Sequence, residues 1–294
     1  MTAGNAASAA PLSNWDNMKL RFNTRIGTAL VLIPLVLGIT VYGTHELFAG
    51  LCAVIILTGI WEWVGLAGIH DRRWKAFMVV LTALLLTVCY RNIDSSMTLF
   101  IVGSSLAWWV GALVLIIRRQ LGRKFSPGLM LQTGIGIIVL VPAWVSLVAL
   151  HADADVHGPV LVTCLLILIW SVDTGAYYVG QKWGRKQLAS HVSPGKTLEG
   201  LYGALGCGLF VAVICSLLLQ LGLYKSILFL LVCLVTTAVS IVGDLTESMI
   251  KRSGGVKDSG ELLPGHGGAL DRIDSMTAAA PGFFTGVLLL EATS

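Results

Sequence analysis

One stretch of the chain decides the class of fold. Residues 226–243 read SILFLLVCLVTTAVSIVG, a run without a single charge, and Asp244 follows directly. A helix needs about 20 mostly apolar residues to cross the hydrocarbon layer of a membrane. The stretch therefore predicts a membrane-spanning helix whose last turns carry charged residues at one membrane surface.

The rest of the sequence has the same character. Of its 294 residues, 55% are hydrophobic and 12% are charged, whereas soluble domains carry roughly 25% charged residues. Nine apolar runs are long enough to span a membrane, and they cover residues 26–43, 47–66, 76–90, 97–117, 132–151, 158–180, 198–220, 226–247 and 275–291. We therefore predict an all-α, polytopic membrane protein with about nine transmembrane helices.

Lysine and arginine gather on one side of this arrangement. If the N-terminus is cytoplasmic, Arg91 and Lys225 are the basic residues of the outer loops, and the rest of the 20 lie in inner segments. Cytoplasmic loops of membrane proteins carry an excess of basic residues. The distribution predicts a cytoplasmic N-terminus and an outer C-terminus.

Composition divides the chain into three parts. Residues 1–25, rich in alanine, serine and asparagine, predict a disordered or interfacial segment without a signal-peptide cleavage site. Residues 26–151 hold five spans that are almost free of charge. Residues 152–294 hold four spans together with the polar motifs. We therefore expect the chemistry in the second half of the chain.

The segment between the eighth and ninth spans differs from an ordinary membrane linker. Residues 251–274 read KRSGGVKDSGELLPGHGGALDRID, which mixes glycines, a histidine and charges of both signs. Asp271 and Asp274 at its end begin the last span. Four polar residues ahead of it follow helical spacing and share one helix face: Asp244, Glu247, Ser248 and Lys251.

These carboxylates predict an ion and phosphate site. Carboxylates in membrane helices are costly and by default indicate a functional site. Two carboxylate pairs brought together by a hairpin would suit a hard divalent cation with phosphate oxygens. Nearby cations would hold phosphate charge, and they are Lys251, Arg252, Lys257 and Arg272. The alternative is salt bridging among these charges at the membrane surface.

A second polar cluster lies between the sixth and seventh spans. Asp173 stands in otherwise apolar helix, and SPGKTLEG follows at residues 193–200. Ser193 as N-cap with Pro194 at the first position predicts a helix start. Lys196 would add positive charge to this anion-binding helix end. The alternative is an interfacial turn whose lysine extends to the surface.

A carboxylate in the first half receives a different interpretation. Glu62 stands between Trp61 and Trp63 near the inner membrane surface. Tryptophan is enriched at membrane surfaces, and we interpret Glu62 as an interfacial anchor. The six cysteines all lie inside apolar runs and are interpreted as small buried residues.

Together these motifs resemble a known family. Residues 248–274 contain S-x-x-K-R, four residues, K-D, and then H-G-G-x-x-D-R-x-D, which resembles the signature of the phosphatidate cytidylyltransferases, or CDP-diacylglycerol synthases. Residues 173–177 and 193–200 also resemble segments of that family. Ala269 and Leu198 depart from it, because larger aliphatic and aromatic residues are more common there. The motifs cover roughly residues 170–275, and the first half resembles the family in hydropathy and span count.

The resemblance implies a reaction, cofactors and roles for residues. CTP and phosphatidate would give CDP-diacylglycerol and pyrophosphate for phospholipid biosynthesis, with Mg²⁺ or a paired Mg²⁺/K⁺ centre. It implies a catalytic cluster of Asp244, Asp271, Lys251 and Ser248, and metal ligation by Asp244, Asp271 and Asp274. It implies substrate binding by Lys196, Arg252, Lys257, His266, Gly267, Gly268, Arg272 and Asp173.

The resemblance and the basic loops also predict the partners, the location and the orientation of the protein. The partners would be CTP, phosphatidate of the inner leaflet and membrane lipids. The resemblance allows a homodimer, and no nucleic acid is expected. We predict a multi-pass protein of the cell's inner membrane with its active site facing the cytoplasm, where CTP is found. The basic loops place both motif clusters on that side.

Two other functions stay open at this point. A related membrane nucleotidyltransferase or kinase-like enzyme would act on another lipid phosphate or on a polyprenol, and one sequence does not exclude it. An ion-coupled transporter would use Asp173 and Asp244 as its ion site. A transporter predicts polar residues through several spans, whereas the first five spans here are almost uncharged and no internal repeat is found.

Overall fold

The computed structural model describes residues 30–123, 128–153, 157–260 and 267–292. Eight helices in these ranges are long and apolar enough to cross a membrane. They are α2 (His45–Leu66), α3 (Arg72–Arg91), α4 (Ser96–Gln120), α5 (Leu129–Ala152), α6 (Gly158–Trp183), α7 (Leu198–Leu218), α8 (Leu223–Ser253) and α9 (Leu270–Glu291). A shorter apolar helix covers Leu30–Tyr42. The prediction of an all-α polytopic membrane protein is confirmed. Eight of the nine predicted spans coincide with these long helices, and the described part of the first, residues 30–43, coincides with the shorter one.

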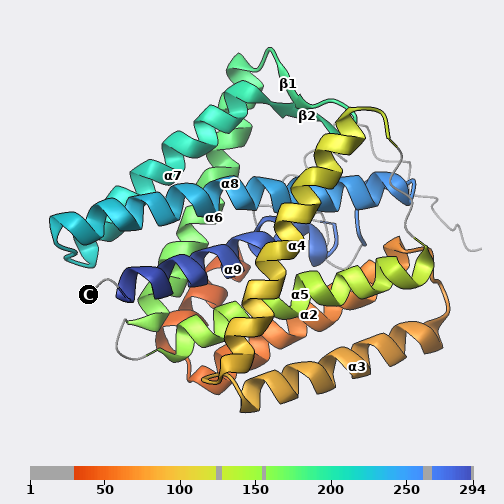
Figure 1. Cartoon of the computed structure of the whole chain (residues 1–294), viewed down its shortest axis with the longest axis horizontal. Coiled ribbons are helices and arrows are strands. Elements are labelled where there is room, and N and C mark those ends of the chain that lie inside the picture. The colour runs from red at the N-terminus through yellow and green to blue at the C-terminus, as the bar shows by residue number, and fades with distance from the viewer. Residues whose placement is uncertain (1–29, 124–127, 154–156, 261–266, 293–294) are drawn as a thin grey trace, which may run out of the picture.

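The helices form one bundle in which α9 lies inside (Figure 1). Helix α9 packs along α8 and also contacts α2, α4, α5 and α6. The small residues Ala278, Ala279 and Ala280 are fully buried on it. Small side chains let helices approach closely where lipid provides no hydrophobic drive for association. The Asp271 side chain in the first turn of α9, which is 7% exposed, is thereby held inside the protein.

Gly243 brings α8 especially close to the first turns of α9. A Cβ atom at position 243 would stand 2.7 Å from the Asp274 carbonyl oxygen and 2.9 Å from the Ala278 side chain. Any larger residue would push the two helices apart. Asp244 is the next residue on α8, so this contact sets the distance between the carboxylates that the two helices carry.

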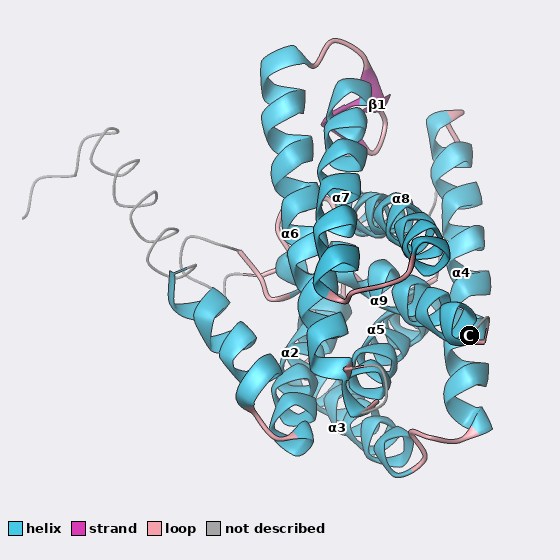
Figure 2. Ribbon diagram, turned by 90° about the vertical axis from the view of Figure 1, so that its left-hand side faces the viewer, coloured by secondary structure: helices cyan, strands magenta, loops and turns pink. Residues whose placement is uncertain are grey.

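A small hairpin stands at the common end of α6 and α7 (Figure 2). Strands β1 (Gln187–Ala189) and β2 (Ser193–Thr197) pair antiparallel. The prediction that Ser193 and Pro194 begin a helix is wrong, because they begin β2 instead. Proline is tolerated at the first residues of an edge strand, where its missing N–H breaks no ladder.

Thr197 is the residue that begins α7. Its hydroxyl accepts a hydrogen bond from the Gly200 N–H at 3.1 Å, which makes it the N-cap. Glu199 in the first turn accepts the N–H groups of Arg185 and Lys186 at 2.9 and 3.2 Å. These bonds fix the hairpin against α7 and therefore fix the position of the residues that β2 carries.

Helices α6 and α7 pack closely because each has a glycine at the point of contact. A Cβ atom at Gly203 would stand 2.6 Å from the Val179 side chain and 2.7 Å from the Gly175 carbonyl oxygen. A Cβ atom at Gly175 would in turn meet the Gly203 carbonyl oxygen at 2.9 Å. The interface has no room for a side chain at either position.

Gly203→Val is therefore expected to destabilise the protein by about 1–3 kcal/mol, the usual cost of overpacking. The measurement is the melting temperature of the purified protein in detergent. Gly206→Val is the matched control, because a Cβ atom there on the same helix meets nothing within 4 Å. Equal melting temperatures for the two variants would contradict this account of the interface.

Candidate active site

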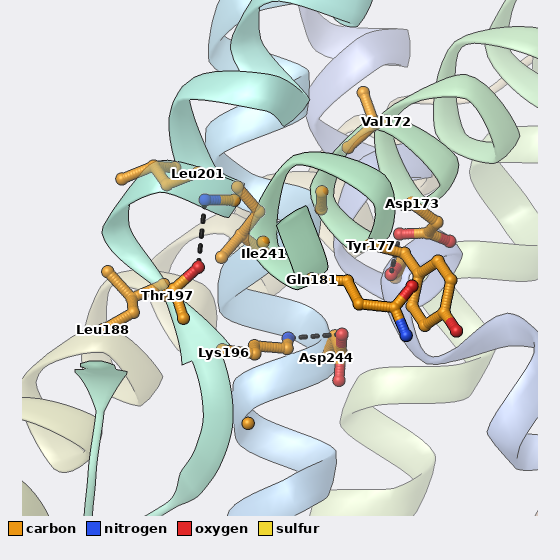
Figure 3. A pocket seen from close by; sticks show the side chains of 15 residues that line it. Val172, Asp173, Tyr177, Gln181, Leu188, Lys196, Thr197, Leu201, Ile241 and Asp244 are labelled. Carbon is orange, nitrogen blue, oxygen red and sulfur yellow. Dashed lines mark hydrogen bonds and ion pairs between the residues drawn. The ribbon is translucent and has the colours of Figure 1, made fainter. Parts of the chain in front are cut away.

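One pocket gathers polar residues from both motif clusters (Figure 3). It has a volume of about 440 Å³ and lies among α6, α7, α8, α9 and the β1–β2 hairpin. Its polar lining includes Asp173, Tyr177, Gln181, Lys196, Asp244 and Ser275. Three of the residues predicted from the sequence thus share one cavity between membrane-spanning helices.

Lys196 joins the two clusters. Its ammonium group forms an ion pair with Asp244 Oδ2, and their side chains are 25% and 27% exposed. Figure 3 shows the lysine reaching from the hairpin to α8. One turn further along α8, the Ser248 hydroxyl lies 3.4 Å from Asp244 Oδ1, at the limit of a hydrogen bond.

Lys251 forms a second, buried set of ion pairs. Its Nζ atom lies 2.9 Å from Glu247 Oε1 and 2.7 Å from Asp271 Oδ1. The three side chains are 11%, 4% and 7% exposed. Because all three side chains are largely buried, these pairs are not salt bridges at a solvated surface, the alternative considered from the sequence. Removal of either partner would leave an uncompensated charge inside the protein.

Asp271 is also held by the backbone of the preceding segment. Its carboxylate accepts the Ser259 N–H at 3.0 Å and the Gly268 N–H at 2.9 Å. Gly267 has φ +83°, a left-handed conformation that favours glycine, and a Cβ atom there would stand 2.7 Å from Asp271 Oδ2. The glycines of this motif therefore wrap the backbone around the carboxylate. Neither Gly267 nor Gly268 lines the pocket of Figure 3.

Three carboxylates of three different helices interact with one another, and two of them, Asp173 and Asp244, line the pocket. Asp173 of α6, Asp244 of α8 and Asp274 of α9 interact electrostatically. Asp173 Oδ1 lies 3.4 Å from the Ser275 hydroxyl, which donates to it. The like charges of these three side chains would repel one another unless a cation or a proton lies among them.

The donor atoms fit a hard cation, although the arrangement does not form a complete coordination shell. Carboxylate oxygens are the ligands that Mg²⁺ prefers in proteins. Glu247 Oε2 is buried and has no hydrogen-bond partner in the described residues. Within those same ranges, no three histidine, cysteine, aspartate or glutamate side chains are grouped as a metal site. Metal ligation by Asp244, Asp271 and Asp274 stays a prediction.

The other predicted substrate-binding residues lie nearer the surface. Arg252, Lys257 and Arg272 are exposed. Arg252 donates to the Val256 carbonyl oxygen at 3.1 Å. None of the three forms an ion pair with a described residue, so their charges face the solvent. His266 lies outside the described residues.

Glu62 is the residue that sequence reasoning interpreted wrongly. It is 7% exposed and so is not an interfacial anchor. Its carboxylate accepts hydrogen bonds from the Ser259 hydroxyl at 2.8 Å and from the Ala269 and Leu270 N–H groups at 2.9 Å each. The signal was present, because Glu62 is a carboxylate in an apolar run. The rule applied to Asp173 would have identified it.

The sequence matches one protein family almost from end to end. Residues 23–290 match the Cytidylyltransferase family. The chain is 39% identical over 259 residues to the phosphatidate cytidylyltransferase of Pseudomonas aeruginosa, a match that covers 88% of this chain and 94% of that protein. It is 35% identical over 277 residues to the Haemophilus influenzae protein of the same name, covering 88% and 96%. The likeness thus extends into the first half of the sequence, and the chain belongs to the cytidylyltransferase family.

Proposed function

We propose that this chain is a membrane enzyme that transfers the cytidylyl group of CTP to phosphatidate, giving CDP-diacylglycerol and pyrophosphate. The observation that carries the proposal is the ion pair of Lys196 with Asp244 in a pocket between membrane-spanning helices. Such a pocket can receive a charged headgroup from the lipid side and a nucleotide from water. The names of the relatives, matched over nearly their whole length, support the same reaction.

The chemistry asks mainly for control of negative charge. A phosphate oxygen of phosphatidate attacks the α-phosphorus of CTP, and the bond from that phosphorus to the oxygen of pyrophosphate breaks. Both reactants are anions, so groups that neutralise the developing charge supply most of the catalysis. A phosphate monoester is largely ionised at neutral pH and needs no strong base. Lys196 and the solvent-facing Arg252, Lys257 and Arg272 are the proposed phosphate-binding residues.

Lys251 and Ser248 complete the proposed catalytic cluster. Lys251 holds Asp271 at the first turn of α9, and Ser248 stands beside Asp244 on α8. His266, Gly267 and Gly268 are proposed to shape the nucleotide site. In this arrangement the two glycines do so indirectly, because they pack on the Asp271 carboxylate and on Ser259 and Glu62.

We also propose Mg²⁺ as the cofactor, with K⁺ as the second ion that the family resemblance allows. Asp244, Asp271 and Asp274 are the proposed ligands, and Asp173 lies beside them. Within the cluster, Lys196 and Lys251 form ion pairs with carboxylates. The carboxylates outnumber these two ammonium groups, so the cluster has negative charge left for a cation to balance. The ion would neutralise charge on phosphate oxygens.

The proposed setting is the inner membrane with the site facing the cytoplasm. The basic residues of the candidate site lie on the side that holds most of the basic residues of the chain. Arg91 at the end of α3 and Lys225 in the first turn of α8 lie on the other side by the same count. A cytoplasmic N-terminus follows from this orientation. A homodimer stays a prediction from the resemblance.

The experiment is an assay with the purified protein in detergent micelles. Labelled CTP, phosphatidate and Mg²⁺ are expected to give a labelled liponucleotide and an equal amount of pyrophosphate. Parallel reactions contain diacylglycerol or a polyprenyl phosphate in place of phosphatidate. Product from polyprenyl phosphate alone would favour the related nucleotidyltransferase, and no product from any lipid phosphate would contradict the proposal.

A further inference from the structure

Glu62 is a buried carboxylate that belongs to the first half of the chain but binds the second half. It lies near the end of α2, and its partners Ala269 and Leu270 are 207 and 208 residues away in sequence. Both carboxylate oxygens accept hydrogen bonds. No lysine or arginine among the described residues forms an ion pair with it. Its negative charge is therefore balanced by backbone and hydroxyl donors.

These donors include the backbone N–H groups at the start of α9, those of Ala269 and Leu270. The first N–H groups of a helix have no partner within the helix and need an acceptor from elsewhere. Position 269, the N-cap of α9, is an alanine, which has no side-chain acceptor. Glu62 supplies the missing acceptor from another helix, and its charge is favourable at the positive end of the helix dipole. The first turn of α9 is thus fixed by α2.

The two positions that pack on the Glu62 carboxylate, 260 and 268, are both glycines. A Cβ atom at Gly260 would stand 2.7 Å from Glu62 Oε1. A Cβ atom at Gly268 would collide with Glu62 Oε2 and with the Ser259 hydroxyl. The backbone on both sides of the carboxylate therefore packs directly on it. This contact explains why glycine is needed at positions 260 and 268.

Ser259 connects Glu62 to the proposed catalytic cluster. Its hydroxyl donates to Glu62 Oε2 at 2.8 Å, while its N–H donates to Asp271 Oδ2 at 3.0 Å. Asp271 in turn receives Lys251 at 2.7 Å. One residue thus touches both carboxylates, and a shift of Glu62 would be transmitted to Asp271 through Ser259.

We infer that Glu62 is a positioning residue for the reaction. It does not line the pocket of Figure 3, and it acts by holding the first turn of α9 and Ser259 so that Asp271 and Asp274 face Asp244 and Lys251. The inference rests on the proposed function. It assigns a role in the reaction to α2, a helix outside the motifs of the second half of the chain.

The test is a comparison of Glu62→Gln, Ser259→Ala and the double variant. Glutamine keeps the size of the side chain but puts an amide N–H₂ against an N–H donor, so at least one bond is lost and one contact becomes repulsive. We expect kcat to fall by about tenfold or more, since one charge-assisted hydrogen bond is worth roughly that factor. The KM values for CTP and phosphatidate should change by less than about twofold, because ground-state binding contacts are untouched.

Two readouts separate positioning from a loss of folded protein. The kcat deficit should persist at every temperature well below the melting transition, in samples that elute as the wild type does in size-exclusion chromatography. The double variant should be no slower than Glu62→Gln, because residues that act through one path are not additive. Multiplying effects, or a deficit that disappears on cooling, would overturn the inference.

Glu46→Gln is the control on the same helix, since Glu46 is exposed and lies outside the site. It should leave kcat within about twofold of the wild type. A wild-type chain without activity would contradict the proposed function itself. An active wild type with normal kcat in Glu62→Gln would contradict this inference alone.

Discussion

Lys251→Met is expected to abolish activity and to destabilise the folded protein by about 3–5 kcal/mol, the cost of removing one partner from a buried ion pair. Methionine nearly fills the same volume but leaves Glu247 and Asp271 without their cation. Both carboxylates are more than nine-tenths buried, so solvent cannot replace it. The measurements are the melting temperature in detergent and the rate of liponucleotide formation.

Two further variants complete this experiment. Lys225→Met removes a lysine at the opposite end of the same helix, and it should melt within a few degrees of the wild type. Lys251→Met combined with Glu247→Gln should regain part of the lost stability, because the second change removes one of the uncompensated charges. A Lys251→Met protein that melts like the wild type would show that these ion pairs contribute nothing to the fold.

Asp244→Asn is expected to lower kcat by roughly 10²–10³-fold, the usual effect of removing one electrostatic group from an active site. Stability should change by less than about 1 kcal/mol, because loss of the partly exposed pair with Lys196 is offset by relief of the repulsion among Asp244, Asp173 and Asp274. Asparagine keeps the shape of the side chain and removes its charge. The loss would therefore report on charge at the pocket and not on packing.

Asp94→Asn is the matched control for this change, because Asp94 is exposed in the turn between α3 and α4. It should be indistinguishable from the wild type in rate and in melting temperature. Full activity in Asp244→Asn would remove Asp244 from the catalytic cluster and from the proposed metal ligands. It would leave the family assignment unaffected, since that rests on the sequence match.

The membrane-spanning helices could be predicted from the sequence because lipid imposes a simple rule. An apolar run must satisfy its backbone internally, so it becomes a helix wherever it is long enough. The polar connections follow no such rule. Ser193 and Pro194 have the pattern of a helix start, yet Thr197 has the hydroxyl that accepts the N–H of Gly200. Because Ser193 and Thr197 pair with β1, this segment is a strand, and the helix begins after Thr197.

Some residues of the candidate site could likewise be grouped from the sequence, and others could not. Asp244, Lys251 and Asp271 could be grouped from the sequence because one helical face and one short connection join them. The ion pair of Lys196 with Asp244 depends on how the hairpin folds over α8. The bonds of Glu62 depend on a contact between α2 and α9 across most of the chain. No local pattern in a single sequence encodes a contact at that distance.

The attachment of α9 to α2 has a consequence for how this protein is made. Helix α2 enters the membrane roughly 200 residues before α9 is synthesised, at a rate of about 5–20 residues per second. During those many seconds the Glu62 carboxylate has none of its final partners. The apolar residues of α2 must keep the segment inserted against the cost of one acidic group, which is below the roughly 3 kcal/mol of a helix centre because Glu62 lies near the helix end. Arrival of the last helix supplies the N–H donors for Glu62 and brings Asp271 to Lys251, so we expect a chain that ends before α9 to be inactive.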